Sequence, residues 1–238
     1  MRNQIVFLVH GKYALFTDPL TRMGGEKESY QIPTYESLVG VTSSIYWKPT
    51  LIWVIDQARV IKPIQMESKG TRPMDYNNSF KSNLSYVSYL RDVSYEVKAH
   101  FEFNKFRPDL SADWNENKHY ELMKRSIRAG GRRDIFLGTR ECQAYVEPLT
   151  GFGENPSAYD DIPEMNFGLM FHGFNYPDQT GNDQLDARFW KASMKHGVID
   201  YPRPDACEFV RSNVRKMSAK DFNDHNFTYV DREMGDES

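Results

Sequence analysis

The stretch from Leu84 to Phe106 constrains the fold more than any other, because its apolar residues recur at every second position. These residues are Val93, Tyr95, Val97, Ala99, Phe101 and Phe103. Successive side chains of a strand point to opposite faces of a sheet, so this period predicts a half-buried strand. We therefore predict one long strand over residues 84–106.

The segments around this strand alternate between strand and helix patterns. Three further strands are predicted over residues 3–16, 50–64 and 141–149. Thr34 can cap a helix that runs to about Tyr46, and Pro49 ends it because the residue before proline is pushed out of the α region. A second helix begins after Asp113 or Asn115, either of which can be its N-cap. The resulting order, β-α-β-β-α-β, is that of ferredoxin-like and RNA-recognition-motif domains.

The remaining segments have a different composition, richer in polar and turn-forming residues. Residues 66–83 are polar, contain Gly and Pro, and predict a long loop. After Thr150 a turn-rich linker leads to two short strands, over residues 167–176 and 185–199, and to an acidic tail that we expect to be frayed. We therefore expect an α+β fold: a ferredoxin-like, RNA-recognition-motif-like domain over residues 1–150, then a small β-rich domain over residues 151–238.

Composition narrows the class of protein. Hydrophobic residues make up 39% of the chain and no apolar run reaches the length of a membrane-spanning helix. The N-terminus lacks the apolar region and cleavage site of a signal peptide. Two cysteines provide neither a disulfide framework nor a zinc site. We expect a cytoplasmic protein that makes no membrane contact and is a monomer when free.

Charge is distributed unevenly, although the net charge is only −3. Residues 105–140 carry nine Lys or Arg against five Asp or Glu, whereas residues 151–186 carry seven acids and no Lys or Arg. A basic patch on an otherwise acidic chain fits a polyanion site confined to one face. The alternative is that these charges coat solvated helix faces.

Lys118 and His119 fall in the first turn of the second predicted helix. Unpaired backbone N–H groups and the helix dipole favour an anion there, phosphate included. Histidine is the one side chain that changes charge near neutral pH, so its place beside cations suggests RNA chemistry. The plainer alternatives are a helix cap or surface histidine at 119, a surface lysine at 118 and core packing for Tyr46.

Several segments resemble the Cas-five family of CRISPR proteins, specifically the type I-C (Dvulg) branch. They occur in family order over most of the chain. The matching segments are Gly11–Thr17, Ser29-Tyr30, Ile45–Pro49 (IYWKP), Leu90–Tyr95, Lys118-His119, Leu137–Cys142, Gly153-Glu154 and Gly197–Ile199. IYWKP together with the downstream Lys-His pair discriminates best. The sequence departs from the family pattern at residues 33–37, 68–72 and 129–132, which bears on repeat specificity more than on chemistry.

The resemblance implies a ferredoxin-like N-terminal domain with a β-rich extension. Members of this branch cut CRISPR precursor RNA within each repeat, near the base of its hairpin. They then hold the 5′ handle of the guide RNA (the crRNA) as a subunit of the type I-C interference complex, beside its backbone and large subunits. The residues that the branch uses for cutting match Tyr46, Lys118 and His119.

The chemistry expected of these residues needs no metal. No Asp/Glu/His cluster has the spacing of metal ligands, and we expect no cofactor. The 2′-hydroxyl of the RNA would attack the adjacent phosphate and leave a 2′,3′-cyclic phosphate and a 5′-hydroxyl. His119 is the candidate for proton transfer, Lys118 for stabilising the phosphorane and Tyr46 for orienting or deprotonating the hydroxyl. Which of Tyr46 and His119 is base and which is acid stays open.

Further basic residues are candidates for RNA binding, since arginine suits bidentate contact with phosphate. They are Arg22, Lys27, Lys124, Arg125, Arg128, Arg132, Arg133 and Arg140. The sequence thus predicts a metal-independent endoribonuclease. A non-catalytic subunit that only caps the 5′ handle is the alternative, and a general RNA-binding protein outside CRISPR is a third reading.

Overall fold

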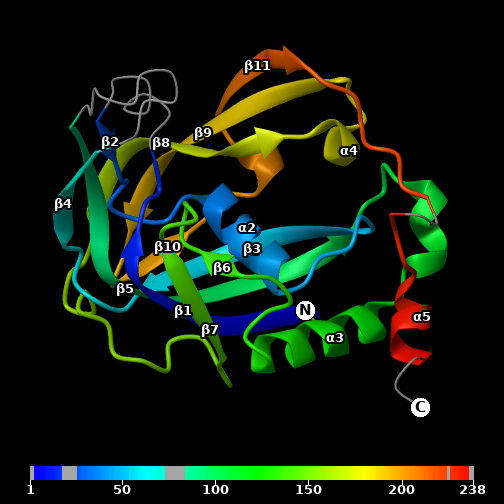
Figure 1. The fold of residues 1–238 in the computed structure, drawn as a ribbon, viewed down its shortest axis with the longest axis horizontal. Coiled ribbons are helices and arrows are strands. Elements are labelled where there is room, and N and C mark those ends of the chain that lie inside the picture. Colours follow the sequence, from blue (N-terminus) through cyan, green and yellow to red (C-terminus); the bar gives the residue numbers. More distant parts are fainter. Residues whose placement is uncertain (1–2, 18–25, 73–83, 224–225, 236–238) are drawn as a thin grey trace.

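The computed structural model describes residues 3–17, 26–72, 84–223 and 226–235, with side chains as far as Arg232. It is a mixed α+β structure in which strands predominate (Figure 1). The strands are β1 (Gln4–Ala14), β2 (Lys27–Glu28), β3 (Leu51–Val60), β4 (Met66–Thr71), β5 (Ser85–Phe103), β6 (Ile135–Phe136), β7 (Gln143–Pro148), β8 (Met165–Asn175), β9 (Gln184–Met194), β10 (Val198–Asp200) and β11 (Phe209–Lys216). The helices are α2 (Tyr35–Ile45), α3 (Glu116–Arg128), α4 (Pro177–Thr180) and α5 (Val230–Gly235), with 3₁₀ turns over Pro108–Asp113 and Pro204–Ala206.

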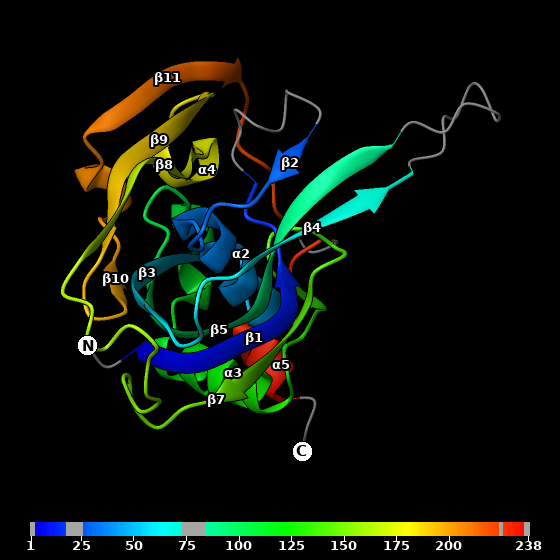
Figure 2. The same ribbon diagram turned by 90° about the vertical axis from the view of Figure 1, so that its left-hand side faces the viewer.

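The main sheet is organised around β5, which at 19 residues is the longest strand described. The strand order is β10-β3-β5-β1-β7-β6, and β2 and β4 also pair with β5. The pairings of β5 with β1, β3 and β4 are antiparallel, whereas β2 runs parallel to it. Figure 2 shows β4 and the adjacent end of β5 reaching away from the rest of the sheet. The predicted long strand is confirmed.

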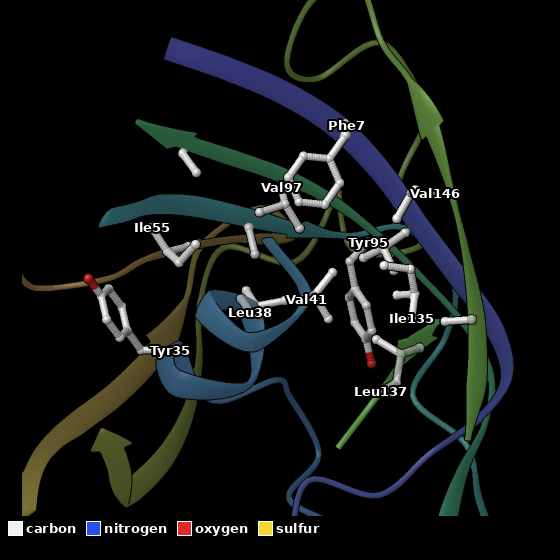
Figure 3. Close-up of a cluster of buried hydrophobic side chains, with 14 of the residues drawn as sticks. Phe7, Tyr35, Leu38, Val41, Ile55, Tyr95, Val97, Ile135, Leu137 and Val146 are labelled. Carbon is white, nitrogen blue, oxygen red and sulfur yellow. The ribbon is translucent and has the colours of Figure 1, made fainter. Parts of the chain in front are cut away.

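The elements that carry the candidate site follow the predicted order β1-α2-β3-β5-α3-β7. Thr34 caps α2, because its Oγ1 accepts the N–H of Ser37 at 3.2 Å. For α3 the structure selects Asn115 as N-cap, since its side-chain oxygen accepts the N–H of Lys118 at 3.2 Å. Helices α2 and α3 both contribute to a large buried cluster, which also includes Phe7, Val97 and Tyr95. Figure 3 shows the part of this cluster that surrounds α2.

Several strands differ from the sequence prediction. The loop predicted over residues 66–83 is wrong in its first part, where Met66–Thr71 forms β4 and pairs with β5. Residues 73–83 of that prediction lie outside the described residues. Strand β11 was not predicted; every one of its residues is exposed, so no alternation marks it.

The C-terminal part contains a second, three-stranded sheet in the order β11-β9-β8. The strand predicted over residues 185–199 is split, because β9 belongs to this small sheet whereas β10 pairs with β3 in the main one. The chain therefore returns to the main sheet after residue 150. The division into domains at that residue stays a prediction.

A buried polar network joins α2 to the second sheet. The Tyr35 ring stacks on His172 with centroids 4.1 Å apart. Arg188 Nε donates to His172 Nδ1 at 3.3 Å, and Arg188 lies 3.9 Å from the Glu36 carboxylate. Burial raises the pKa of Glu36 to about 7 and lowers that of His172 to about 4. These contacts fix the start of α2, the helix that Tyr46 directly follows.

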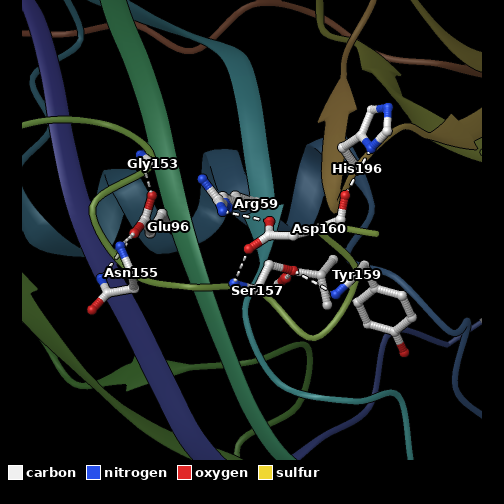
Figure 4. A network of polar contacts seen from close by, with 9 residues as sticks. Arg59, Glu96, Gly153, Asn155, Ser157, Tyr159, Asp160 and His196 are labelled. Atoms are coloured by element: carbon white, nitrogen blue, oxygen red, sulfur yellow. Dashed lines mark hydrogen bonds and ion pairs between the residues drawn. The ribbon is translucent and has the colours of Figure 1, made fainter. Parts of the chain in front are cut away.

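The segment predicted to be a linker instead packs on the main sheet (Figure 4). The Glu96 carboxylate on β5 accepts the backbone N–H groups of Gly153, at 2.5 Å, and Asn155, at 2.8 Å. Asp160 pairs with Arg59 on β3 at 2.6 Å. Buried Glu96 needs these donors, which explains why this turn-rich stretch is held in place.

Within the parts of the chain described here, no helix has the length and apolar character needed to cross a membrane.

Gly138 provides a test of the packing between the loop after β6 and the end of β1. Its φ of +91° favours glycine, and a Cβ there would lie 1.9 Å from the carbonyl oxygen of Leu15. We expect Gly138→Ala to lower the free energy of unfolding by more than about 2 kcal/mol, since backbone must move. Urea denaturation measures this.

Gly40 on α2 is the matched control. A Cβ at Gly40 meets nothing within 4 Å, so Gly40→Ala should stabilise the protein by up to about 1 kcal/mol through helix propensity. Equal effects of the two substitutions would contradict the close approach at Gly138.

Candidate active site

Tyr46 and His119, 73 positions apart in sequence, meet in the structure. The Tyr46 hydroxyl lies 2.7 Å from His119 Nδ1. Tyr46 follows α2 directly, where its N–H donates to the Thr42 carbonyl at 3.1 Å and its own carbonyl accepts Trp53 Nε1 at 2.8 Å. The backbone of Tyr46 is thus fixed from both sides, and the phenol is aimed at the first turn of α3.

The other ring nitrogen of His119 fixes the direction of this hydrogen bond. His119 Nε2 lies 2.8 Å from the backbone carbonyl of Asp113. A carbonyl oxygen can only accept, so Nε2 carries a proton, and in the neutral imidazole Nδ1 accepts from the Tyr46 hydroxyl. The ring is completely buried and lies 6.0 Å, centroid to centroid, from both Phe101 and Phe103. The pair is therefore arranged to pass a proton from the phenol to the imidazole.

Asp113 is a member of the site that sequence reasoning treated only as a possible helix cap. Its side chain is fully buried, and one carboxylate oxygen accepts the N–H of Val230. The other, Oδ2, has no hydrogen-bond partner and lies 3.4 Å from His119 Nε2. A carboxylate so placed stabilises positive charge on the ring. Asp113 precedes His119 by six residues, a spacing that matches neither helix nor strand periodicity. The sequence therefore did not mark Asp113 as a partner of His119.

Arg132 approaches Tyr46 from the loop after α3. Gly130 and Gly131, with φ of +83° and +104°, end the helix and turn the chain back. The N–H of Arg132 then donates to the Ile45 carbonyl at 3.1 Å, and its guanidinium lies 4.6 Å from the Tyr46 ring centroid. Such a cation over an aromatic face is attracted to it, so a fixed positive charge lies beside the phenol.

Lys118 does not join Tyr46 and His119. Its Nζ forms an ion pair with the carboxylate of Asp231 in α5. Adjacent helix positions diverge by about 100°, which is why the buried His119 and the half-exposed Lys118 face different surroundings. The structure thus brings together two of the three candidate catalytic residues.

A cavity of about 270 Å³ lies in front of Tyr46, and we call it the Tyr46 cavity. Besides Tyr46 it is lined by Ser43, Ser44, Trp47, Lys48, Pro49, Arg132, Arg133, Phe222, Asn226, Phe227 and Thr228. His119 lies behind Tyr46 and does not line it. Tyr46 is therefore the member of the pair positioned to touch a ligand, and three cations share the cavity with it.

The C-terminal tail, predicted to be frayed, covers this site from the other side. Val230 is 1% exposed and belongs to the main buried cluster, and Phe227 is also buried. Around these two residues the prediction is wrong, because their apolar side chains anchor a segment whose composition is otherwise acidic.

The other candidate RNA-binding residues are spread over the surface. Lys124 and Arg128 line a separate cavity beside α3, and Lys27 lines a third with Thr139. Arg125 and Arg140 are exposed. Arg22 lies outside the described residues. Of these candidates, only Arg132 and Arg133 line the Tyr46 cavity, so the sequence did not distinguish the cations of the site from the rest.

Among the described residues, no group of three or more His, Cys, Asp and Glu could hold a metal ion.

Comparison with known proteins shows which family the chain resembles. The model of a family described as "CRISPR-associated protein (Cas_Cas5)", Cas_Cas5d, matches residues 4–202. The protein named "CRISPR pre-crRNA endoribonuclease Cas5d" from Mannheimia succiniciproducens is 29% identical over 229 residues, which cover 85% of this chain and 96% of that protein.

Two solved structures share the fold. One, described as "Crystal Structure of CRISPR-associated Protein", has a TM-score of 0.74 and 38% identity. The other, a functionally uncharacterized protein, SMU1763c, from Streptococcus mutans, has a TM-score of 0.73 and 40% identity. Each comparison covers 87% of this chain and 96% of the other. Because the family model matches well over half of the residues of this chain, the chain belongs to the Cas5d family of CRISPR-associated proteins.

Proposed function

We propose that this protein is a metal-independent endoribonuclease that cleaves CRISPR precursor RNA within the repeat, at the base of its hairpin. It would then stay on the 5′ handle of the guide as a subunit of the type I-C complex. The proposal rests on one observation: a buried hydrogen bond from Tyr46 to His119 at the wall of a cavity that carries three cations. The name of the Mannheimia relative, a pre-crRNA endoribonuclease, supports the reaction class.

Proton transfer would run through the Tyr46–His119 pair. The 2′-hydroxyl gives its proton to Tyr46 Oη as Tyr46 gives its own to His119 Nδ1, and the 2′-oxygen attacks the phosphorus. The bond to the 5′-oxygen breaks, and that oxygen takes a proton from solvent. The imidazolium formed on His119 faces the carboxylate of Asp113, and the phosphorane faces the cations of the Tyr46 cavity.

Cleavage of the cognate repeat hairpin in EDTA tests this function. We expect the native protein to cut and to leave a 2′,3′-cyclic phosphate, and a 2′-deoxy substitution at the cleavage position to abolish cutting. His119→Ala and Tyr46→Phe should each lower the single-turnover rate by about 10²–10⁴-fold, the usual contribution of a positioned acid or base.

His10→Ala is the control, because His10 on β1 pairs with Glu147 and lies outside the Tyr46 cavity. Its rate should match that of the native protein. Cutting that requires Mg²⁺, or survives the 2′-deoxy substitution, would refute the mechanism. RNA that is bound but left intact would favour the subunit that only caps the handle.

Asp113→Asn tests the carboxylate behind His119. The amide keeps an oxygen for the N–H of Val230 but removes the charge 3.4 Å from Nε2. We expect kcat to fall about tenfold, which corresponds to about 1.4 kcal/mol of lost stabilisation of the imidazolium, with KM unchanged. Single-turnover kinetics and thermal unfolding together decide the matter. A loss that follows the melting temperature, or that appears only in KM, would make Asp113 purely structural.

A further inference from the structure

The C-terminal segment of residues 226–231, which we call the covering segment, lies directly over the candidate site. Figure 1 shows the chain after β11 descending past the start of α3 to reach α5. The segment lies beyond residue 202, where the match to the family model ends. Its Asn226, Phe227 and Thr228 form part of the wall of the Tyr46 cavity.

Oxygen atoms of the covering segment hold two cations, one inside the Tyr46 cavity and one beside it on α3. Lys48 Nζ donates to the backbone carbonyl of Thr228 at 2.6 Å. Lys118 Nζ forms its ion pair with the carboxylate of Asp231. Phosphate oxygens could make the same contacts with these two ammonium groups, since they accept hydrogen bonds as a carbonyl or a carboxylate oxygen does and also carry negative charge.

The reactive groups are closed off from solvent while the covering segment is in place. The exposed fraction of Tyr46 is 1%, and that of His119 is zero. The segment reaches them through Val230, whose N–H is bonded to Asp113, the residue that holds His119. A phosphodiester could not approach the Tyr46 hydroxyl closely while the segment is in this position.

We propose that a phosphate-binding surface for the RNA backbone lies beneath the covering segment, built from Lys48, Lys118 and Arg132 around Tyr46. Thr228 and Asp231 occupy it in the free protein, and the RNA displaces them. The inference rests on the proposed function and deepens it, because it assigns the scissile region of the RNA to one surface. It also gives Lys118 a place in the site that its present ion pair hides.

The strengths of the contacts fit such displacement. The side chains of Lys118 and Asp231 are 35% and 60% exposed, and half-exposed ion pairs are weak and screened by salt. A polyanion that offers several phosphates competes well for these cations. The apolar anchors, Phe227 and Val230, give the covering segment a defined resting place when no RNA is bound.

The test compares Asp231→Asn with Asp161→Asn, which removes the same charge from an exposed position in the loop before β8. The measured quantity is the affinity for a repeat hairpin with a 2′-deoxy cleavage position, over a range of salt concentrations. We expect Asp231→Asn to bind about 5–10-fold more tightly than the native protein and to show a salt slope steeper by about one phosphate contact. Asp161→Asn should stay within about twofold of native, since a single distant charge is screened.

Lys118→Gln completes the comparison. In the Asp231→Asn background it should remove the gain in affinity, because the gain depends on the released ammonium group. Hydrogen exchange supplies a second readout: amides of residues 226–231 should exchange faster when the uncleavable hairpin is bound.

The outcomes separate this inference from the proposed function. If Asp231→Asn matches Asp161→Asn, and the amides of residues 226–231 stay protected in the RNA complex, the covering segment is a permanent part of the fold and the inference is wrong, whether or not the native protein cuts. If the segment is displaced and affinity rises, but the native 2′-hydroxyl hairpin remains intact, the binding surface stands and the nuclease assignment falls.

Discussion

The pairing of β5 with β3 and β1 determines where the candidate site can form. Phe101 on β5 pairs with Trp53 on β3, and the two rings meet edge to face at 5.5 Å. Trp53 donates to the carbonyl of Tyr46, and Phe101 contacts His119. Because side chains alternate between faces, a slip of one residue in this register would turn the ring on the shifted strand away from its partner and from the helices. The ends of α2 and α3 therefore meet only in the observed register.

Burial then dictates the chemistry available to the Tyr46–His119 pair. An imidazole with no access to water needs partners for both nitrogens, since an unpaired buried polar group is costly. The Asp113 carbonyl accepts a hydrogen bond from Nε2–H, which in the neutral ring leaves Nδ1 as an acceptor for the phenol. The 3₁₀ turn that ends at Asp113, followed by the cap at Asn115, directs this carbonyl toward the ring. Local backbone geometry thus sets which nitrogen of His119 faces the phenol.

The sequence predicted those parts of the fold that leave a period or a cap, such as β5 and α2. It missed β4 and β11, where most or all residues are exposed and burial imposes no alternation. Within the site, His119 was proposed from its place in the first turn of a basic helix and Tyr46 from the family resemblance. Their contact depends on a fold that brings residues 73 positions apart together. The role of Asp113 depends on a backbone carbonyl and a distant N–H, neither of which has a sequence signature. The acidic composition of the tail concealed the apolar anchor Val230.

The covering segment combines two kinds of interaction that respond differently to salt. Its ion pair, Lys118 with Asp231, weakens as salt rises, and so does the binding of an RNA backbone to the same cations. The burial of Phe227 and Val230 is apolar and is not screened. Salt therefore weakens the binding of the competing RNA more than it weakens the attachment of the covering segment as a whole. It follows that high salt alone does not expose Tyr46, and that opening the site requires a polyanion able to contact several cations at once.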